Sequence, residues 1–239
     1  MSEDKLSSSS DLKLLTVFVP VFNEVATIDE CLRRVLSSPC VAEIIVVDDF
    51  STDGTREFLS SISDPRVRVL FQPKNMGKGA ALRLALKTAN SQLFIIQDAD
   101  LEYDPQDFEK IIRPFLKNEA DVVFGSRFVG GGERRVPEFW HSIGNKLLTS
   151  ISNCFTNLYL TDMATCYKCF RTEQLKALEL RENRFGIDPE ITMKISRQKV
   201  RIVEVGVSYS RRSYDEGKKI GIGDAFRHLF CIVYYRFRS

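Results

Sequence analysis

Three acidic side chains, each two residues from the next, follow an apolar run near the middle of the chain. The run is Leu93–Ile96, and the acids are Asp98, Asp100 and Glu102. Like charges this close repel by roughly 1–4 kcal/mol per pair at about 4 Å, depending on the local dielectric. Residues two apart in an extended segment point the same way, so the three carboxylates are expected to face one direction. Such a cluster needs a positive partner or a protonated member, because burial raises the pKa of an unpaired carboxyl group.

A hard divalent cation is the partner that these acids fit best. Mg²⁺ and Mn²⁺ bind one or two carboxylates together with the phosphates of a ligand. In that position a cation would neutralise charge on a departing diphosphate. The alternative is that the acids only cap the following helix. One acid is enough for a cap, and Asp104 before Pro105 is expected to be that N-cap.

Polar clusters also follow the three apolar runs that precede this one. They are Pro20–Glu24, Asp48–Gly54 and Asn75–Gly79. In open parallel sheets, ligands bind beyond the carboxyl ends of the strands, where the strand order reverses. Clusters in register at four strand ends therefore predict one shared site. Asp48 and Asp49 are expected to bind a base or ribose, with Lys78 and backbone amides near phosphate.

Other nucleotide and metal motifs are not matched. Asp49–Gly54 is similar to the first half of an EF-hand loop, but Ser60 stands where the bidentate Glu is required. The chain has no G-x-x-x-x-G-K-[ST] motif, and no G-x-G-x-x-G follows its first apolar run. Cys166 and Cys169 have CxxC spacing without the second ligand pair that a zinc site needs.

The elements that must position these clusters alternate between strand and helix patterns. Expected strands are Leu14–Val19, Ile44–Val47, Val67–Phe71, Leu93–Ile96, Asp121–Gly125 and Arg201–Val207. Helical periodicity follows each of the first four strands and recurs over Phe139–Phe155, Pro189–Arg197 and Asp224–Arg238. Thr27 and Glu30 are expected to form a capping box at the first helix. The alternation predicts a doubly wound α/β fold with a mostly parallel central sheet flanked by helices.

Composition and charge limit the class of protein. The chain has 239 residues, of which 44% are hydrophobic and 28% charged, as in ordinary globular proteins. A net charge of +2 gives no reason to expect a nucleic-acid partner. Residues 1–13 lack the apolar core of a signal peptide and are expected to be a disordered tail. No apolar run reaches the roughly 18–20 residues of a membrane span. We therefore expect a cytoplasmic, non-secreted protein with free thiols.

Together, the motifs resemble family-2 glycosyltransferases of the glycosyltransferase-A fold. The matching stretches are Val-Pro-Val-Phe-Asn-Glu (19–24), Val-Val-Asp-Asp-x-Ser-x-Asp-Gly-Thr (46–55), Asn-x-Gly-Lys-Gly-x-Ala-x-Arg (75–83) and Asp-Ala-Asp (98–100). Gly125-Ser-Arg127, Gly144-Asn145 and residues 212–220 narrow the resemblance to the dolichyl-phosphate mannose synthase and polyprenyl-phosphate glycosyltransferase branch. The resemblance covers residues 14 to 223. It implies one domain over 14–239, with a nucleotide-sugar half (14–125) and an acceptor half (126–239) that ends in an amphipathic helix.

The resemblance implies inverting transfer of a sugar from GDP-mannose or UDP-glucose, or a similar donor, to a dolichyl or polyprenyl phosphate, with Mg²⁺ or Mn²⁺ as cofactor. The implied donor-binding residues are Pro20, Phe22, Glu24, Asp48, Asp49, Asn75, Gly77, Lys78, Asp98, Ala99, Asp100, Arg212 and Lys218. The implied metal ligands are Asp98, Asp100 and Glu102. The implied catalytic residues are Asp98, Asp100, Arg127 and Arg212. Arg127 matches an arginine that meets the acceptor phosphate in the family, and the charges of Arg134 and Arg135 suit the same phosphate. For Arg134 and Arg135 the alternative is a solvated loop.

The acceptor decides whether a catalytic base is needed. A lipid phosphate is already ionised near neutral pH, whereas a hydroxyl of a glycan or protein needs a base. Asp188 and Glu190 lie near the position where other family-2 enzymes place that base, although capping of a helix before Pro189 is the simpler role for Asp188. A nucleotide-sugar-binding regulatory subunit is the alternative that is not an enzyme. A sugar-1-phosphate nucleotidyltransferase is disfavoured because Pro20–Glu24 replaces its glycine-rich loop.

The last helix has two possible roles. Its aromatic residues beside Arg227, Arg236 and Arg238 suit a membrane interface, and they equally suit packing against the core. The first role implies peripheral contact with the cytosolic face of a membrane, made directly or through a membrane-anchored partner.

Overall fold

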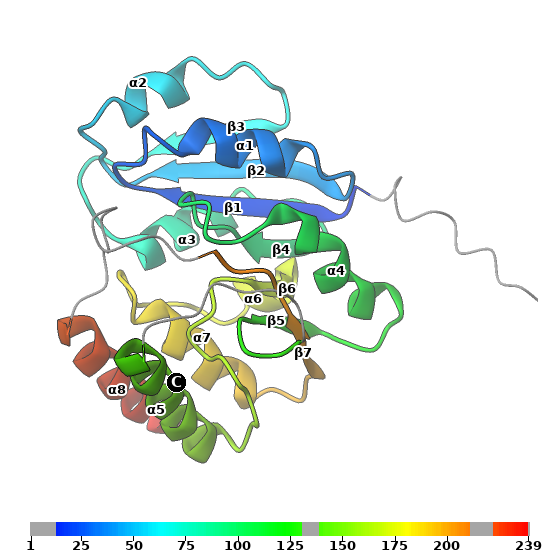
Figure 1. Ribbon diagram of the computed structural model, residues 1–239, viewed down its shortest axis with the longest axis vertical. Helices are drawn as coiled ribbons and strands as arrows, with labels where there is room; N and C mark the ends of the chain where they lie inside the picture. Colours follow the sequence, from blue (N-terminus) through cyan, green and yellow to red (C-terminus); the bar gives the residue numbers. More distant parts are fainter. Residues whose placement is uncertain (1–12, 131–138, 211–221, 239) are drawn as a thin grey trace, which may run out of the picture.

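The computed structural model describes residues 13–130, 139–210 and 222–238 and contains one seven-stranded sheet (Figure 1). The strands are β1 (Leu15–Val21), β2 (Val41–Asp48), β3 (Val67–Phe71), β4 (Leu93–Ile96), β5 (Val122–Ser126), β6 (Lys168–Arg171) and β7 (Ile202–Gly206). Their order across the sheet is β3-β2-β1-β4-β6-β5-β7. All neighbours are parallel except β6, which is antiparallel to both β4 and β5. The predicted α/β fold with a mostly parallel sheet is therefore confirmed.

The helices connect and cover these strands. They are α1 (Ile28–Leu36), α2 (Thr55–Ser60), α3 (Lys78–Leu86), α4 (Phe108–Leu116), α5 (Phe139–Thr156), α6 (Thr172–Lys176), α7 (Ile187–Ser196) and α8 (Ile222–Phe237), with a 3-10 turn over Pro105–Asp107 before α4. In Figure 1, α5, α7 and α8 gather beyond the β4–β6 part of the sheet, and they contact one another. A second small core, which includes Met193, Cys231 and Tyr235, joins these three helices.

Strand β6 was not predicted from the sequence. It has only four residues, and its first residue is a lysine whose side chain is fully buried. A charged residue at a core position breaks the apolar run on which the prediction of strands depends. The short helix α6 follows immediately and was missed as well.

Two predicted helix caps had different outcomes. Asp104 accepts a hydrogen bond from Gln106 N at 3.0 Å, with Pro105 next in the chain, so the predicted N-cap is confirmed. The predicted capping box at α1 is wrong. The Thr27 hydroxyl donates to Glu24 Oε2 at 2.9 Å, and Glu30 pairs with arginines one turn further along the same helix.

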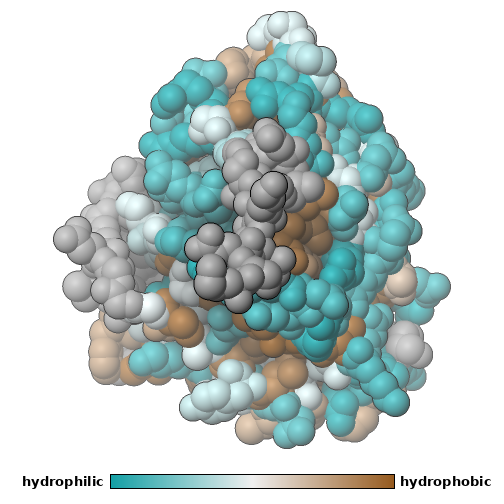
Figure 2. All heavy atoms as spheres, turned by 90° about the vertical axis from the view of Figure 1, so that its right-hand side faces the viewer, coloured by the Kyte–Doolittle hydropathy of each residue, from teal (hydrophilic) through white to brown (hydrophobic). Residues whose placement is uncertain are grey.

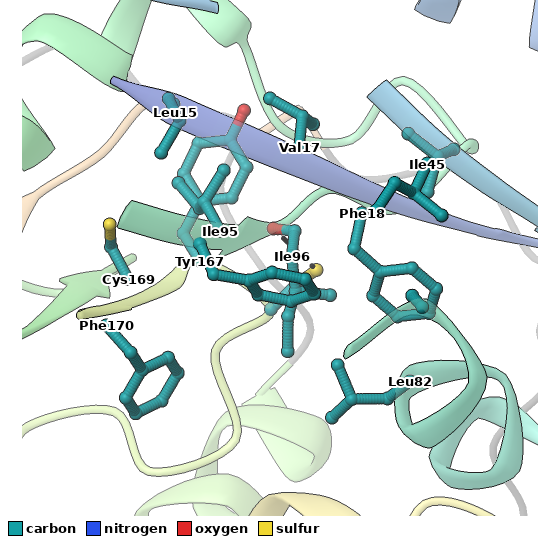
Figure 3. Packing of buried hydrophobic residues seen from close by; sticks show 14 of the residues in the cluster. Leu15, Val17, Phe18, Ile45, Leu82, Ile95, Ile96, Tyr167, Cys169 and Phe170 are labelled. Atoms are coloured by element: carbon teal, nitrogen blue, oxygen red, sulfur yellow. Dashed lines mark hydrogen bonds between the residues drawn. The ribbon is translucent and has the colours of Figure 1, made fainter. Parts of the chain in front are cut away.

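The core lies on both faces of the central strands, as expected for a parallel sheet covered by helices. Figure 3 shows Phe18 and Ile96 pointing from β1 and β4 toward Leu82 on α3. Tyr167 fills the space beside Ile96, and its hydroxyl donates to Gln97 Oε1 at 2.5 Å. This packing fixes the ends of β1 and β4, from which the polar clusters emerge.

The prediction that the cysteines are free thiols is confirmed. All six cysteines are free, and Cys154 is the exposed one.

The face in Figure 2 is hydrophilic over much of its area, with apolar side chains gathered around its centre and in its lower half. None of the helices in the described ranges is long and apolar enough to cross a membrane. The tail expected over residues 1–13 lies outside the described residues, apart from residue 13.

Candidate active site

The strand order reverses between β1 and β4, which lie side by side. From β1 the chain moves outward to β2 and β3, and then crosses back along α3 to β4. Such a reversal leaves a crevice at the carboxyl ends of the two strands. Pro20–Glu24 leaves β1 and Gln97–Asp100 leaves β4 at this point. The fold therefore places two of the predicted clusters at the switch point.

The loops after β1 and β2 are fastened to each other by hydrogen bonds. Asn23 N donates to Ser51 Oγ at 2.9 Å, and Asn23 Oδ1 accepts from Thr52 N at 2.8 Å. Glu24 N donates to Thr55 Oγ1 at 3.1 Å. Asn23 has a φ of +54°, in the left-handed region that non-glycine residues seldom adopt. This bonding holds the Pro20–Glu24 segment in one conformation above the crevice.

The two aspartates at the end of β2 both have partners within the chain. Asp48 is fully buried and pairs with Arg56 at 3.2 Å. Asp49 accepts hydrogen bonds from Met76 N at 2.6 Å and Gly77 N at 2.8 Å. Burial raises the pKa of Asp49, although these two amide bonds oppose the rise. Asp49 thus anchors the Asn75–Gly79 loop, and contact of either aspartate with a base or ribose stays a prediction.

Lys78, at the start of α3, lies against the acidic stretch. Its Nζ is 2.7 Å from Asp98 Oδ1 and 3.8 Å from Cys166 Sγ. Burial alone would lower the pKa of Lys78, but the charge of Asp98 opposes this, and the net pKa lies well above its usual value. The ammonium group therefore stays charged beside Asp98. The sequence predicted that these two clusters meet, but it did not indicate Cys166.

The acidic stretch is not extended, so the expectation that three acids face one direction is wrong for Glu102. Leu101 has a φ of +62°, and Asp100 Oδ1 accepts from Glu102 N at 3.2 Å, which closes a local turn. Glu102 Oε2 instead accepts from the hydroxyl of Tyr209 at 2.7 Å. Within the described ranges, no group of three or more His, Cys, Asp or Glu side chains is arranged to hold a metal ion.

Arg127, just beyond β5, is held by a carboxylate that the sequence analysis missed. Its Nε and Nη2 lie 2.6 Å and 2.7 Å from the two carboxylate oxygens of Asp162, which is fully buried. Asn145 Nδ2 donates to the same carboxylate at 3.1 Å. The guanidinium carbon lies 5.2 Å from the centre of the Tyr209 ring. Tyr209 therefore contacts both residues, Arg127 through its ring and Glu102 through its hydroxyl.

Asp188 lies within the first turn of α7, and its predicted role as a helix cap is wrong. Its carboxylate pairs with Lys168 Nζ at 2.6 Å, and Lys168 is fully buried. Burial alone would raise the pKa of Asp188, but Lys168 and Lys78 lower it, and the net pKa lies below its usual value. A carboxylate so stabilised in its ionised form is a weak proton acceptor.

The remaining predicted residues divide into two groups. Pro20 and Phe22 are partly buried, Glu24, Gly77 and Ala99 are buried, and Asn75 is exposed. Arg134, Arg135, Arg212 and Lys218 lie outside the described residues. The partners missed by the sequence analysis were Asp162, Lys168 and Tyr209. The sequence offered one signal for such a partner, which is a charged residue inside an apolar stretch, as at Lys168.

The fold is that of the glycosyltransferase-A class. A crystal structure of glucosyl-3-phosphoglycerate synthase from Mycobacterium tuberculosis with Mn²⁺, UDP and phosphoglyceric acid has a TM-score of 0.70 to this chain. It is 19% identical and covers 95% of this chain, and the match spans 79% of that chain. The glycosyl transferase family 2 model matches residues 16–178. The chain belongs to glycosyl transferase family 2.

Curated relatives come from the branch that the motifs indicated. A dolichol-phosphate mannosyltransferase of Pyrococcus furiosus is 29% identical, and the match covers 92% of this chain and 63% of that protein. The chain thus spans less than two thirds of that relative's length. An undecaprenyl-phosphate mannosyltransferase of Micrococcus luteus is 27% identical, covering 90% of this chain and 91% of the relative. A UDP-N-acetylglucosamine–dolichyl-phosphate N-acetylglucosaminyltransferase of Methanococcus voltae is 26% identical. The match covers 88% of this chain and 92% of that relative.

Proposed function

We propose that this protein transfers a sugar from a GDP-mannose or UDP-glucose type of donor to a dolichyl or polyprenyl phosphate, with inversion at the anomeric carbon. The observation that carries the proposal is the ion pair of Lys78 with Asp98 at the switch point of the sheet, with Asp100 two residues further along the same loop. That combination suits a nucleoside diphosphate leaving group. The names of the three relatives above support a lipid phosphate as acceptor.

The pairing of Asp188 supports the same acceptor class. A hydroxyl acceptor would need a general base, and both residues considered for that role are already ion-paired, Asp188 with buried Lys168 and Glu190 with Lys194. A phosphate monoester is ionised near neutral pH and can attack the anomeric carbon without a base. The phosphate oxygen forms the new bond as the bond from that carbon to the diphosphate breaks.

Asp98 and Asp100 fit the oxygen-donor chemistry of Mg²⁺ or Mn²⁺. With Glu102 bonded to Tyr209, the donor set that fits is one or two carboxylates completed by diphosphate oxygens. When bound, the cation would neutralise charge on the leaving diphosphate. Lys78 adds a fixed positive charge at the same place. Without the ligand, Lys78 balances the charge of Asp98.

Arginines are proposed to hold the acceptor phosphate. The ion pair with Asp162 fixes the guanidinium group of Arg127 in one orientation. Because this conformational entropy is already lost before the phosphate binds, the pair aids alignment of the acceptor. Arg134 and Arg135 are proposed to contact the acceptor phosphate, and Arg212 and Lys218 the donor. The proposals for Arg212 and Lys218 rest on the motif over residues 212–220, and those for Arg134 and Arg135 rest on their charge.

An assay that varies donor and acceptor together tests this function. The protein would be incubated with Mg²⁺ or Mn²⁺, one labelled donor (GDP-mannose, UDP-glucose or UDP-N-acetylglucosamine) and either a short polyprenyl phosphate or the matching unphosphorylated polyprenol. We expect label in the organic phase with the phosphate alone, and none after a chelator is added. Transfer to the alcohol as well would favour a hydroxyl acceptor. Donor binding without turnover would favour a regulatory subunit.

Helix α8 has one buried face and one exposed face. One face, with Ile232 and Tyr235, packs in the small core against α5 and α7. The other face is exposed and carries large apolar side chains. They are Phe226, Phe230, Val233 and Phe237. Neighbouring α5 exposes Phe139, Ile143 and Leu147. We propose that these two exposed faces contact the membrane that carries the acceptor; a location on the cytosolic side stays a prediction.

Replacing Phe226 and Phe237 with serine should weaken binding to phospholipid vesicles about tenfold or more, because burial of each aromatic ring contributes roughly 1.5–3 kcal/mol. Co-sedimentation with phosphatidylcholine vesicles, with and without anionic lipid, measures this change. Leu116→Ser is the matched control, since Leu116 is an exposed apolar residue at the end of α4. Equal binding by the double variant and the wild type would exclude α8 as the contact.

A further inference from the structure

The segment from Arg181 to Gly186 crosses the first turn of α3, the helix that begins with Lys78. Ala80 N donates to Asn183 O at 3.1 Å. The guanidinium group of Arg83 donates to Glu182 O and to Asn183 Oδ1. The backbone at Glu182 and Asn183 is therefore bonded directly to the helix that presents the donor-site lysine.

The two glycines that flank Lys78 make this close approach possible. A Cβ atom on Gly79 would lie 2.2 Å from Glu182 O, and one on Gly77 would lie 2.4 Å from Asn183 O. Real Cβ atoms essentially never come that close to backbone oxygens, so any larger residue would push the two segments apart. Gly77 also has a φ of +91°, which favours glycine. The position of residues 182–183 thus determines the position of the backbone on both sides of Lys78.

The same segment is fastened on its other side to α8. The buried carboxylate of Glu182 accepts from Arg227 Nη2 at 2.7 Å, from Arg227 Nε at 3.1 Å and from the hydroxyl of Tyr235 at 3.1 Å. Burial alone would raise the pKa of Glu182, but the bonds from Arg227 and Tyr235 lower it, and the net pKa is below its usual value. Glu190 of α7 accepts from the amides of Arg181 and Glu182 at 2.8–3.0 Å.

We propose that Glu182 is a positioning residue for the donor diphosphate: through Arg227 it fixes residues 182–183 between α8 and α3, and so holds Lys78 at Asp98. The inference rests on the proposed function, because it assigns Lys78 to the diphosphate. It also means that α8, the helix proposed to meet the membrane, is connected to the donor site through Glu182, by the Arg227 ion pair and the Tyr235 hydroxyl. The ring of Phe230 on the exposed face of α8 lies 4.9 Å from the guanidinium carbon of Arg227.

Nucleotide binding measured by calorimetry tests this role without an acceptor or turnover. UDP, GDP, UMP and GMP would be titrated in the presence of Mg²⁺ into the wild type, Glu182→Gln and Arg227→Met. We expect each variant to bind the preferred diphosphate about tenfold more weakly, which corresponds to roughly 1.4 kcal/mol. Binding of the matching monophosphate should change much less. The Glu182→Gln, Arg227→Met double variant should lose no more than either single variant, because both remove the same ion pair.

The controls separate positioning from a purely structural role. Arg227 has a half-exposed side chain, so Arg227→Met tests the link from the α8 side if Glu182→Gln fails to fold. Glu173→Gln removes an exposed carboxylate from a pair with Lys176 and should bind nucleotides like the wild type. Unchanged affinity in folded Arg227→Met, or equal losses for diphosphate and monophosphate, would overturn the inference. A wild type that binds none of the four nucleotides would contradict the proposed function and the inference together.

Discussion

Asp100→Asn is expected to reduce kcat/KM for sugar transfer by about 10²–10³-fold, the loss typical of removing one electrostatic stabiliser of a leaving group. Asparagine keeps the volume and the oxygen that accepts from Glu102 N, so the local turn should persist. Only the negative charge is removed, and with it one of the two carboxylates proposed to hold a cation beside the diphosphate. Initial rates with varied donor and saturating acceptor give this value.

Asp104→Asn is the matched control from the same acidic stretch. Asp104 caps the turn before α4, and asparagine is an equally good N-cap. The variant should therefore keep wild-type activity and stability. Asp104→Ala should retain activity while unfolding about 1 kcal/mol more easily. If Asp100→Asn stays within threefold of the wild type, the acids after β4 are structural and the proposed metal-diphosphate role is wrong.

Asp162→Asn is expected to lower the free energy of unfolding by about 3 kcal/mol, since it leaves the largely buried guanidinium group of Arg127 without its carboxylate. Chemical denaturation measures the change. The same variant should raise KM for the lipid phosphate more than KM for the donor, because it frees the side chain proposed to meet the acceptor. A simple loss of stability would reduce the amount of active protein and leave both KM values unchanged.

Asp121→Asn provides the comparison on the surface. Asp121 pairs with Arg201 through two nitrogen–oxygen contacts of 2.9 Å and 3.0 Å, so the chemistry is the same as at Asp162. Both of these side chains are partly exposed to water, which screens their charges. We expect a much smaller change in stability and no change in either KM. Equal destabilisation by the two variants would mean that burial does not set the strength of the Arg127–Asp162 pair.

Sequence alone determined the parallel part of the fold and the edge of the sheet at which the polar clusters lie. Short β-branched runs alternating with amphipathic helices leave few arrangements other than a doubly wound sheet. Because the carboxyl ends of parallel strands share one edge, the clusters after β1, β2, β3 and β4 had to lie near one another. Asp104 was also predictable, since an N-cap depends on its immediate neighbours.

Only the tertiary structure decided how the polar side chains pair. Glu102 was expected beside Asp98 and Asp100, but it bonds to Tyr209, which is 107 residues away in sequence. The partner of Arg127, Asp162, and the partner of Asp188, Lys168, could not be predicted from the sequence either. Periodicity reports which face of an element is buried, and it carries no information on which distant charge compensates a buried one. The need for compensation follows from the cost of burying an unpaired charge, whereas the identity of the partner follows from how the chain folds back on itself.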